Sequence, residues 1–266
     1  MPLTMHEHIA KKIYDIEILT PKQASETLDA DLEKFAEKYR TVLQAGYMAC
    51  ITDNPMGILS FQAVDILGEL GLPTPPDQLM IHLNTFHTKA DMDKTLDGAA
   101  ALGCRNLLVV SGDGSERLAR LKPEEIGVTV NTVTSVELLQ YIHRTRPGVF
   151  ETGVGFNPYE PQEPELEKLR HKIAAGATFV VTQPVLGHDL RVDALRAFHL
   201  PMIVDAWMSK KLHLLSECVG YTIPENTPYD PMSNLQTLRQ HYPDCGLYLA
   251  IVGYKTQFPL LKSVWG

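Results

Sequence analysis

Two carboxylates at the ends of predicted strands are the best candidates for acid–base chemistry. Glu17 lies in the apolar run 14–19, and Asp113 follows the apolar run 106–110. Partial burial in the mouth of a site raises the pKa of a carboxyl group and suits it to general acid catalysis. Strand-end carboxylates can also be structural groups with satisfied hydrogen bonds. The residues alone leave both interpretations open.

Other polar residues gather at the ends of the same kind of apolar run. Ser111-Gly112-Asp113-Gly114 could present backbone N–H groups to a phosphate or a carbonyl, although such a turn is also an ordinary strand exit. The remaining strand-end residues are Thr52, Asp53, Asn54, His82, Asn84, Asn157, Thr182, Gln183 and Asp205. Together they predict a polar ring at one end of an apolar sheet.

Metal and nucleophile motifs are not apparent in the chain. His82 has no second histidine at helical spacing, and His6 and His8 lie in an N-terminal segment that we expect to be frayed. A lone histidine more often packs or hydrogen-bonds than binds a metal, so no metal site is predicted. The sequence also contains neither a G-x-S-x-G elbow nor a phosphate-binding P-loop.

Short apolar runs alternate with segments of helical periodicity along the chain. The expected strands cover residues 14–19, 48–52, 79–84, 106–110, 152–157, 179–182, 202–205 and 247–252. The expected helices cover residues 32–43, 60–70, 89–102, 134–145, 164–175, 188–198, 209–218 and 232–241. This alternation over about 250 residues predicts a (β/α)8 barrel, also called a TIM barrel. A doubly wound open sheet is the alternative, but it usually carries a glycine-rich loop after its first strand, which is absent at residues 19–22.

Length and composition bound the remaining possibilities. The 266 residues would fit two small domains, but the strand count favours one barrel domain over residues 1–266. With 44% hydrophobic and 21% charged residues, the chain has the profile of a globular protein rather than a disordered one. The formal net charge of −8, without a basic run, disfavours nucleic-acid binding.

Compartment and partners are predicted by what the sequence lacks. No stretch approaches the roughly 20 apolar residues that cross a bilayer, and the N-terminus has no secretory apolar region, so a cytoplasmic protein is expected. Cys50, Cys104, Cys218 and Cys245 are far apart, which predicts reduced and mostly buried thiols. The exposed helices of an acidic chain are compatible with a homo-oligomer, although no heptad pattern specifies its size.

The ordered set of strand ends resembles the methylenetetrahydrofolate reductase family. The most specific pieces are GVGFNP at residues 153–158 and KIAAGATFVVTQPV at residues 172–185. Further matching segments are Asp15-Ile16-Glu17 with Pro21-Lys22, Ile51-Thr52-Asp53, Ile81-His82-Leu83-Asn84, and residues 106–113. The resemblance covers residues 14–187, and the final third of the chain matches only loosely.

This resemblance implies a barrel that binds FAD in an extended form across the strand ends. It implies reduction of 5,10-methylenetetrahydrofolate to 5-methyltetrahydrofolate in one-carbon metabolism and methionine biosynthesis, with NADH or NADPH as reductant and with hydride passing through the flavin. Glu17 matches the general acid that protonates folate N5, Asp113 the carboxylate near the flavin and pterin rings, and Gln183 the amide that contacts substrate. The cofactor-binding candidates are Thr52, His82, Ser111, Gly112, Asp113, Asn157 and Lys172.

This chain departs from the family pattern at the ends of several strands. Asn157-Pro158-Tyr159 stands where many members have Tyr-Pro and a nearby His, Ser111 stands where Arg often precedes Gly-Asp, and residues 204–207 replace the usual Gly-Ile-x-Pro. These changes affect flavin and nucleotide contacts more than folate contacts. One alternative function is therefore a flavin-poor, pterin-binding barrel that acts in a methyl-transfer step. Another is a non-catalytic subunit of a one-carbon complex, which would have no need of the acid.

Overall fold

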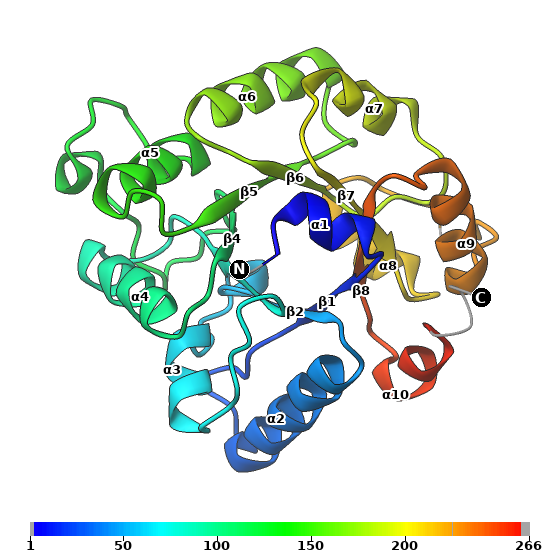
Figure 1. The fold of residues 1–266 in the computed structure, drawn as a ribbon, viewed down its shortest axis with the longest axis horizontal. Coiled ribbons are helices and arrows are strands. Elements are labelled where there is room, and N and C mark those ends of the chain that lie inside the picture. Colours follow the sequence, from blue (N-terminus) through cyan, green and yellow to red (C-terminus); the bar gives the residue numbers. More distant parts are fainter. Residues whose placement is uncertain (1–2, 225, 262–266) are drawn as a thin grey trace. The chain divides into compact units, whose positions relative to one another are not determined.

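The computed structural model describes residues 3–224 and 226–261. Within these residues eight strands follow one another in chain order around a closed barrel (Figure 1). The strands are β1 (Tyr14–Ile18), β2 (Met48–Ile51), β3 (Leu79–Leu83), β4 (Asn106–Val109), β5 (Glu151–Phe156), β6 (Phe179–Thr182), β7 (Met202–Trp207) and β8 (Gly246–Ala250). The predicted (β/α)8 barrel is confirmed, and every predicted strand boundary lies within two residues of the observed one.

Helices alternate with these strands. They are α1 (Met5–Ala10), α2 (Leu28–Gln44), α3 (Ala63–Glu69), α4 (Lys89–Ala101), α5 (Ser135–Thr145), α6 (Gln162–Ala174), α7 (Leu190–Asp193), α8 (Leu212–Val219), α9 (Pro231–His241) and α10 (Tyr254–Gln257). The segment expected as one helix over residues 188–198 is α7 followed by a 3-10 helix, Ala194–Phe198. Thr88, Thr134 and Asp230 each cap the start of a helix by accepting a hydrogen bond from a backbone N–H.

Contacts within the chain divide it into two compact units, which are described separately. Unit 1 comprises Ile18–Val154 with Arg170–Thr178, and unit 2 comprises Leu3–Glu17, Gly155–Leu169 and Phe179–Gly266. The assignment of residues 1–266 to one domain stays a prediction.

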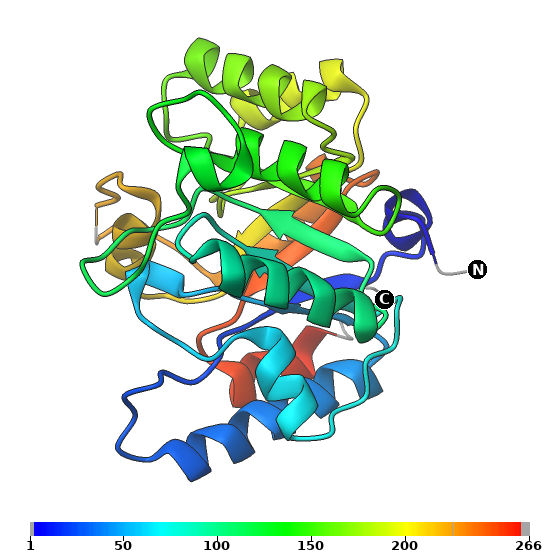
Figure 2. The ribbon, with the colours of Figure 1, turned by 90° about the vertical axis from the view of Figure 1, so that its left-hand side faces the viewer.

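Unit 1 contains β2, β3 and β4, and these strands pair in parallel. All four residues of β2 and of β4 are buried, as expected for strands covered on both faces. Helix α2 packs on β2 and α5 packs on β4. Figure 2 shows α3 and α4 side by side on the outside of this unit, as they are in Figure 1.

Unit 2 contains β6, β7, β8 and β1, and its helix α1 packs against β8. In β8, a Cβ atom at Gly246 would lie 3.3 Å from the Ile9 side chain of α1 and 3.1 Å from Ile203 of β7. Because side chains alternate along a strand, Gly246, Tyr248 and Ala250 share this inner side. The paired register places Asp205 opposite Tyr248 on the same side.

The expectation of a frayed N-terminus was wrong. Residues Met5–Ala10 form α1, whose start is fixed by reciprocal hydrogen bonds between Thr4 and Glu7. His8 of α1 is buried, and its Nε2 lies 2.7 Å from Oδ1 of the buried Asp15 on β1. Helix α1 is held in place on the inner side of unit 2 by two contacts. One is the polar contact between His8 and Asp15, and the other is the close packing of the Ile9 side chain beside Gly246.

Membrane-spanning helices and paired cysteines are both absent from the residues that the structure describes. None of the helices in residues 3–224 and 226–261 has the length and apolar character that a membrane crossing requires. The four cysteines are free, and all except the exposed Cys218 are buried, which confirms that the thiols are mostly buried; their reduced state stays a prediction.

Candidate functional site

The predicted site residues are distributed over both units. Unit 1 carries Thr52, His82, Ser111, Gly112 and Asp113 at or beyond the ends of β2, β3 and β4, and Lys172 in the last turn of α6. Unit 2 carries Glu17 on β1, Asn157 directly after β5, and Gln183 directly after β6.

Glu17 lies in an acidic cluster on the inner side of unit 2. Its side chain is half-buried, and its Oε2 accepts a hydrogen bond of 3.2 Å from the hydroxyl of Tyr248. Asp205 of β7 is buried and pairs in register with Tyr248 of β8. Burial, followed by the nearby charge of Glu17, raises the pKa of Asp205 well above its usual value, and a hydrogen bond from the Ala250 backbone opposes that shift. The cluster therefore holds two carboxyl groups that cannot easily be ionised together.

The ends of β5 and β6 are tied to each other through Tyr159. The Asn157 side chain accepts a hydrogen bond of 3.0 Å from the backbone N–H of Tyr159, which is a tight turn typical of asparagine. The Tyr159 hydroxyl donates to the carbonyl of Pro184 over 2.8 Å. The backbone N–H of Gln183 donates to Phe156, and the Gln183 side chain is exposed. This arrangement leaves the Gln183 amide available to a ligand.

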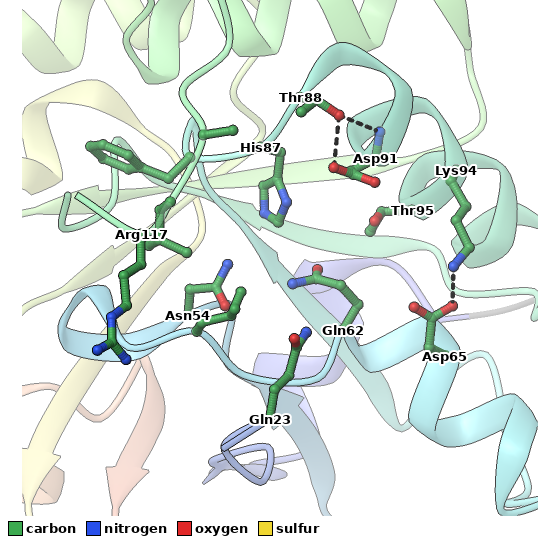
Figure 3. A pocket seen from close by; sticks show the side chains of 14 residues that line it. Gln23, Asn54, Gln62, Asp65, His87, Thr88, Asp91, Lys94, Thr95 and Arg117 are labelled. Atoms are coloured by element: carbon green, nitrogen blue, oxygen red, sulfur yellow. Dashed lines mark hydrogen bonds and ion pairs between the residues drawn. The ribbon is translucent and has the colours of Figure 1, made fainter. Parts of the chain in front are cut away.

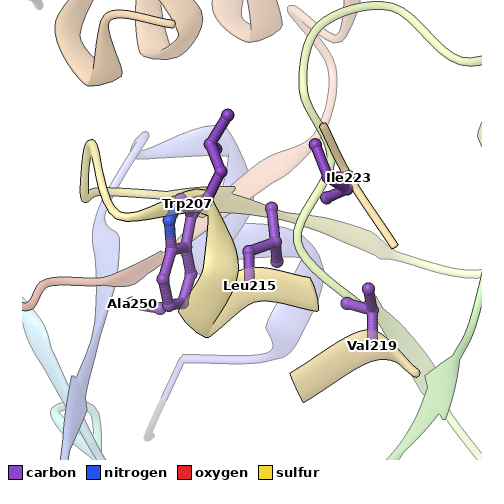
Figure 4. Close-up of a cluster of buried hydrophobic side chains, with 6 residues drawn as sticks. Trp207, Leu215, Val219, Ile223 and Ala250 are labelled. Atoms are coloured by element: carbon purple, nitrogen blue, oxygen red, sulfur yellow. The ribbon is translucent and has the colours of Figure 1, made fainter. Parts of the chain in front are cut away.

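Beyond Asp205, β7 ends in an apolar cluster (Figure 4). Trp207 packs there with Ala250 of β8 and with Leu215 and Val219 of α8, and each of these side chains is buried. Among the described residues, the buried indole Nε1 of Trp207 has no hydrogen-bond partner. The strand predicted to end at residue 205 continues to Trp207. The apolar cluster therefore begins two residues after Asp205.

In unit 1 the buried carboxylate of Asp53 connects the loops that follow β2 and β3. It accepts hydrogen bonds from the backbone N–H of Asn84 over 2.8 Å and from the Gln62 side chain over 3.1 Å. Its Oδ2 also lies 2.7 Å from Nε2 of His87. These contacts satisfy Asp53 within the protein and assign it a structural role.

A polar pocket of about 300 Å³ opens beside this network (Figure 3). His87, Gln62 and Arg117 line it, together with the exposed ion pair between Lys94 and Asp65. The pocket lies wholly in unit 1, among α3, α4 and the loops after β1, β2, β3 and β4. Its lining combines groups of both charges, so the residues alone do not select a class of ligand.

His82 and Thr52 differ in what they can offer a cofactor. Burial lowers the pKa of His82 to about 4, against the opposing charge of Asp53, so the ring is neutral at pH 7. A neutral imidazole can donate and accept hydrogen bonds but supplies no positive charge. The Thr52 hydroxyl is buried and lies 3.5 Å from the carbonyl of Ile18.

The turn after β4 has the most open backbone among the predicted cofactor-binding residues. Residues 111–115 are exposed, and Gly112 adopts a left-handed conformation with φ of +79°. A Cβ atom at Gly112 would lie 2.6 Å from Cβ of Asn84, whose side chain donates to the Asp53 carbonyl. The Ser111 carbonyl accepts a hydrogen bond of 2.8 Å from the Thr85 hydroxyl. A bare, fixed backbone of this kind suits the close approach of a flat or phosphorylated cofactor.

Replacing Gly112 by Ala is expected to destabilise the protein by about 1–3 kcal/mol. The new methyl group would meet the fixed Asn84 side chain, and the left-handed backbone conformation is unfavourable for alanine. Urea unfolding of the purified variant measures the loss. Gly127→Ala is the matched control, because Gly127 has φ of +68° but a Cβ atom added there would meet no atom within 4 Å. Equal losses in both variants would contradict the role of the close approach.

Sequence reasoning missed three residues that shape these clusters, namely His87, Tyr159 and Tyr248. Tyr248 could have been found, because residues 246, 248 and 250 alternate on one side of the last strand. His87 lies in the loop after β3, and in a loop no periodic pattern of residues indicates which way a side chain points.

A barrel of parallel strands with polar side chains at their carboxyl ends is the architecture of a (β/α)8 barrel enzyme. The family model of methylenetetrahydrofolate reductase matches residues 5–198. The chain therefore belongs to the methylenetetrahydrofolate reductase family. Membership supports a folate-related one-carbon reductase, an oxidoreductase that acts on methylenetetrahydrofolate, in a family that is generally flavin-dependent.

Solved structures agree with the fold. A 2,3-dimethylmalate lyase of the PEP mutase/isocitrate lyase superfamily is 8% identical, with a TM-score of 0.54 over 100% of this chain and 86% of that one. Dihydropteroate synthase from Xanthomonas albilineans is 12% identical, with a TM-score of 0.53 over 99% of this chain and 96% of that one. At such identities the likeness concerns the fold alone. No curated protein matches the chain.

Proposed function

We propose that the protein reduces 5,10-methylenetetrahydrofolate to 5-methyltetrahydrofolate with FAD as cofactor and NADH or NADPH as reductant. The observation that carries the proposal is the placement of Glu17 in a chain of this family. Its half-buried carboxyl group is held by Tyr248 at 3.2 Å, beside a second carboxyl group. Such a carboxyl group suits a general acid, because the reaction needs one proton at the substrate nitrogen.

The residues of unit 1 fit a flavin. The exposed turn at Gly112 offers backbone groups to the cofactor. The neutral His82 ring and the Thr52 hydroxyl can form hydrogen bonds with it. Lys172 offers a positive charge for a phosphate. When bound, FAD would supply the hydride chemistry. Asp113, in the same exposed turn, would hydrogen-bond the folate ring, and Gln183 would orient the substrate with its exposed amide.

Purification and visible absorption spectroscopy test the proposal. The expected result is a flavin spectrum that bleaches when NADH or NADPH is added in the absence of oxygen. A colourless protein that cannot be reconstituted with FAD would contradict it.

A second candidate function is methyl transfer from a pterin without a flavin. The ends of β5 and β7 favour it, because the Asn157 side-chain oxygen and the Tyr159 hydroxyl form hydrogen bonds within the protein and Trp207 is enclosed in the apolar cluster. A colourless protein that still binds 5-methyltetrahydrofolate supports this candidate over the first.

A further inference from the structure

Asp205 is a buried carboxyl group whose environment the family pattern does not explain. The residue is 6% exposed, and among the described residues its Oδ1 has no hydrogen-bond partner. Its backbone is fixed on both sides: the N–H donates to the Thr182 hydroxyl over 3.0 Å, and the carbonyl accepts from Val185 over 3.0 Å. The carboxyl group therefore stays in place without a partner for one of its oxygens.

The neighbours of Asp205 make an acidic and apolar environment. Glu17 is the charged side chain that acts on it, and the tyrosines Tyr248, Tyr159 and Tyr229 surround the same end of β7. Burial raises the pKa of Tyr159 to about 12 and raises that of Tyr229 further, so both hydroxyl groups keep their protons at neutral pH. Trp207 lies two residues after Asp205 on β7, so both side chains are on the same side of the strand. Its apolar cluster covers the end of β7 beyond Asp205.

Basic side chains near β7 are directed elsewhere. Helix α9 packs on β7, but its Arg239 lies over the Tyr14 ring at 5.8 Å and donates to the Cys245 carbonyl. Within residues 3–224 and 226–261, no lysine, arginine or histidine contributes to the ionisation of Asp205. A buried carboxyl group without a cation keeps its proton rather than its charge.

We infer that Asp205 forms a proton-sharing pair with Glu17 and is a positioning residue that stores the proton delivered by Glu17. The inference rests on the proposed role of Glu17 as the acid. Two coupled carboxyl groups lose their protons in two separate steps, so that over a wide pH range the pair holds one proton. The more buried group, Asp205, is where that proton rests.

The proton balance of the pair is simple. At rest the single proton of the pair is on Asp205 and Glu17 is a carboxylate. During turnover the proton of Asp205 passes to Glu17, which gives it to the substrate nitrogen. Solvent then returns one proton to the pair through the half-buried Glu17. One proton leaves the pair and one enters it in each turnover, and no electron moves through it.

Infrared spectroscopy of the purified protein tests the pair without any turnover. At neutral pH we expect the carbonyl stretch of a protonated carboxylic acid, above the amide band, and its loss in Asp205→Asn. In Glu17→Gln the band should remain but titrate at lower pH, because the like charge that raises the pKa of Asp205 is gone. Asp65→Asn, at an exposed residue paired with Lys94, is the control and should leave the band unchanged. Absence of the band in wild type, or its survival in Asp205→Asn, overturns the inference.

Kinetics test the use of the stored proton. In Asp205→Asn, the loss of folate reduction with rising pH should begin about one pH unit lower, while flavin reduction by the nucleotide keeps its rate. An unmoved pH profile overturns the relay. If the protein turns over no folate at all, the proposed function fails, and the infrared band still supports or overturns the Asp205–Glu17 pair on its own.

Discussion

Replacing Glu17 by Gln is expected to lower the rate of the folate half-reaction by about a thousandfold, within the range of 10²–10⁴ that general acid catalysis contributes. The substitution keeps a carbonyl oxygen that can accept the Tyr248 hydrogen bond, so the side chain should keep its position. What it removes is the transferable proton. Stopped-flow measurement of reduced flavin mixed with 5,10-methylenetetrahydrofolate, without oxygen, gives this rate.

The nucleotide half-reaction is the internal reference for the same variant. Hydride transfer from NADH or NADPH to the flavin needs no acid at folate N5, so its rate should be within about twofold of wild type. Glu163→Gln, at an exposed residue of α6, is the matched control and should change neither rate. A Glu17→Gln protein with the wild-type folate rate would exclude Glu17 as the acid.

Replacing Asp15 by Ala is expected to destabilise the protein by about 1–3 kcal/mol, the typical cost of leaving a buried hydrogen-bonding group without its partner. Asp15 and His8 are both buried, and His8 would lose the oxygen that lies 2.7 Å from its Nε2. Because α1 contacts the inner side of unit 2 through His8 and Ile9, this loss should loosen the whole helix. Differential scanning calorimetry should show a Tm lower by roughly 2–12 °C.

A matched control separates this burial effect from ion pairing in general. Asp65→Ala breaks the exposed ion pair with Lys94 and should cost less than about 1 kcal/mol. Asp15→Asn keeps an oxygen near His8 and should fall between the two. If Asp15→Ala were as stable as Asp65→Ala, the His8–Asp15 contact would not hold α1 in place.

The barrel could be predicted from the sequence because each strand is a short apolar run that ends at a turn. The run 106–110 is typical, since every residue after Asn106 is apolar, as expected for a strand that is buried on both faces. Helix α1 was missed because six residues are too few for periodicity to register, although the Thr4 and Glu7 pair marks its start. The last two residues of β7 were missed because the predicted strand ended at Asp205.

The candidate site was predictable in residue type but not in pairing. Glu17 was proposed because it is a carboxylate inside an apolar strand, and that role stays a prediction. Its hydrogen-bond partner Tyr248 lies 231 positions away in the chain. A contact of that separation depends on closure of β1 onto β8, which no local pattern reports. Asp53, which the sequence showed only as one of the polar residues at a strand end, is satisfied by His87, Asn84 and Gln62, and no local pattern reports these partners.

The most direct test of the proposed reduction is the oxidation of reduced flavin by the folate itself. The protein is reconstituted with FAD, reduced without oxygen, and mixed with 5,10-methylenetetrahydrofolate. The predicted result is the return of oxidised flavin absorbance together with one equivalent of 5-methyltetrahydrofolate per flavin. Flavin that stays reduced in the presence of saturating folate, with no 5-methyltetrahydrofolate formed, would contradict the proposed function.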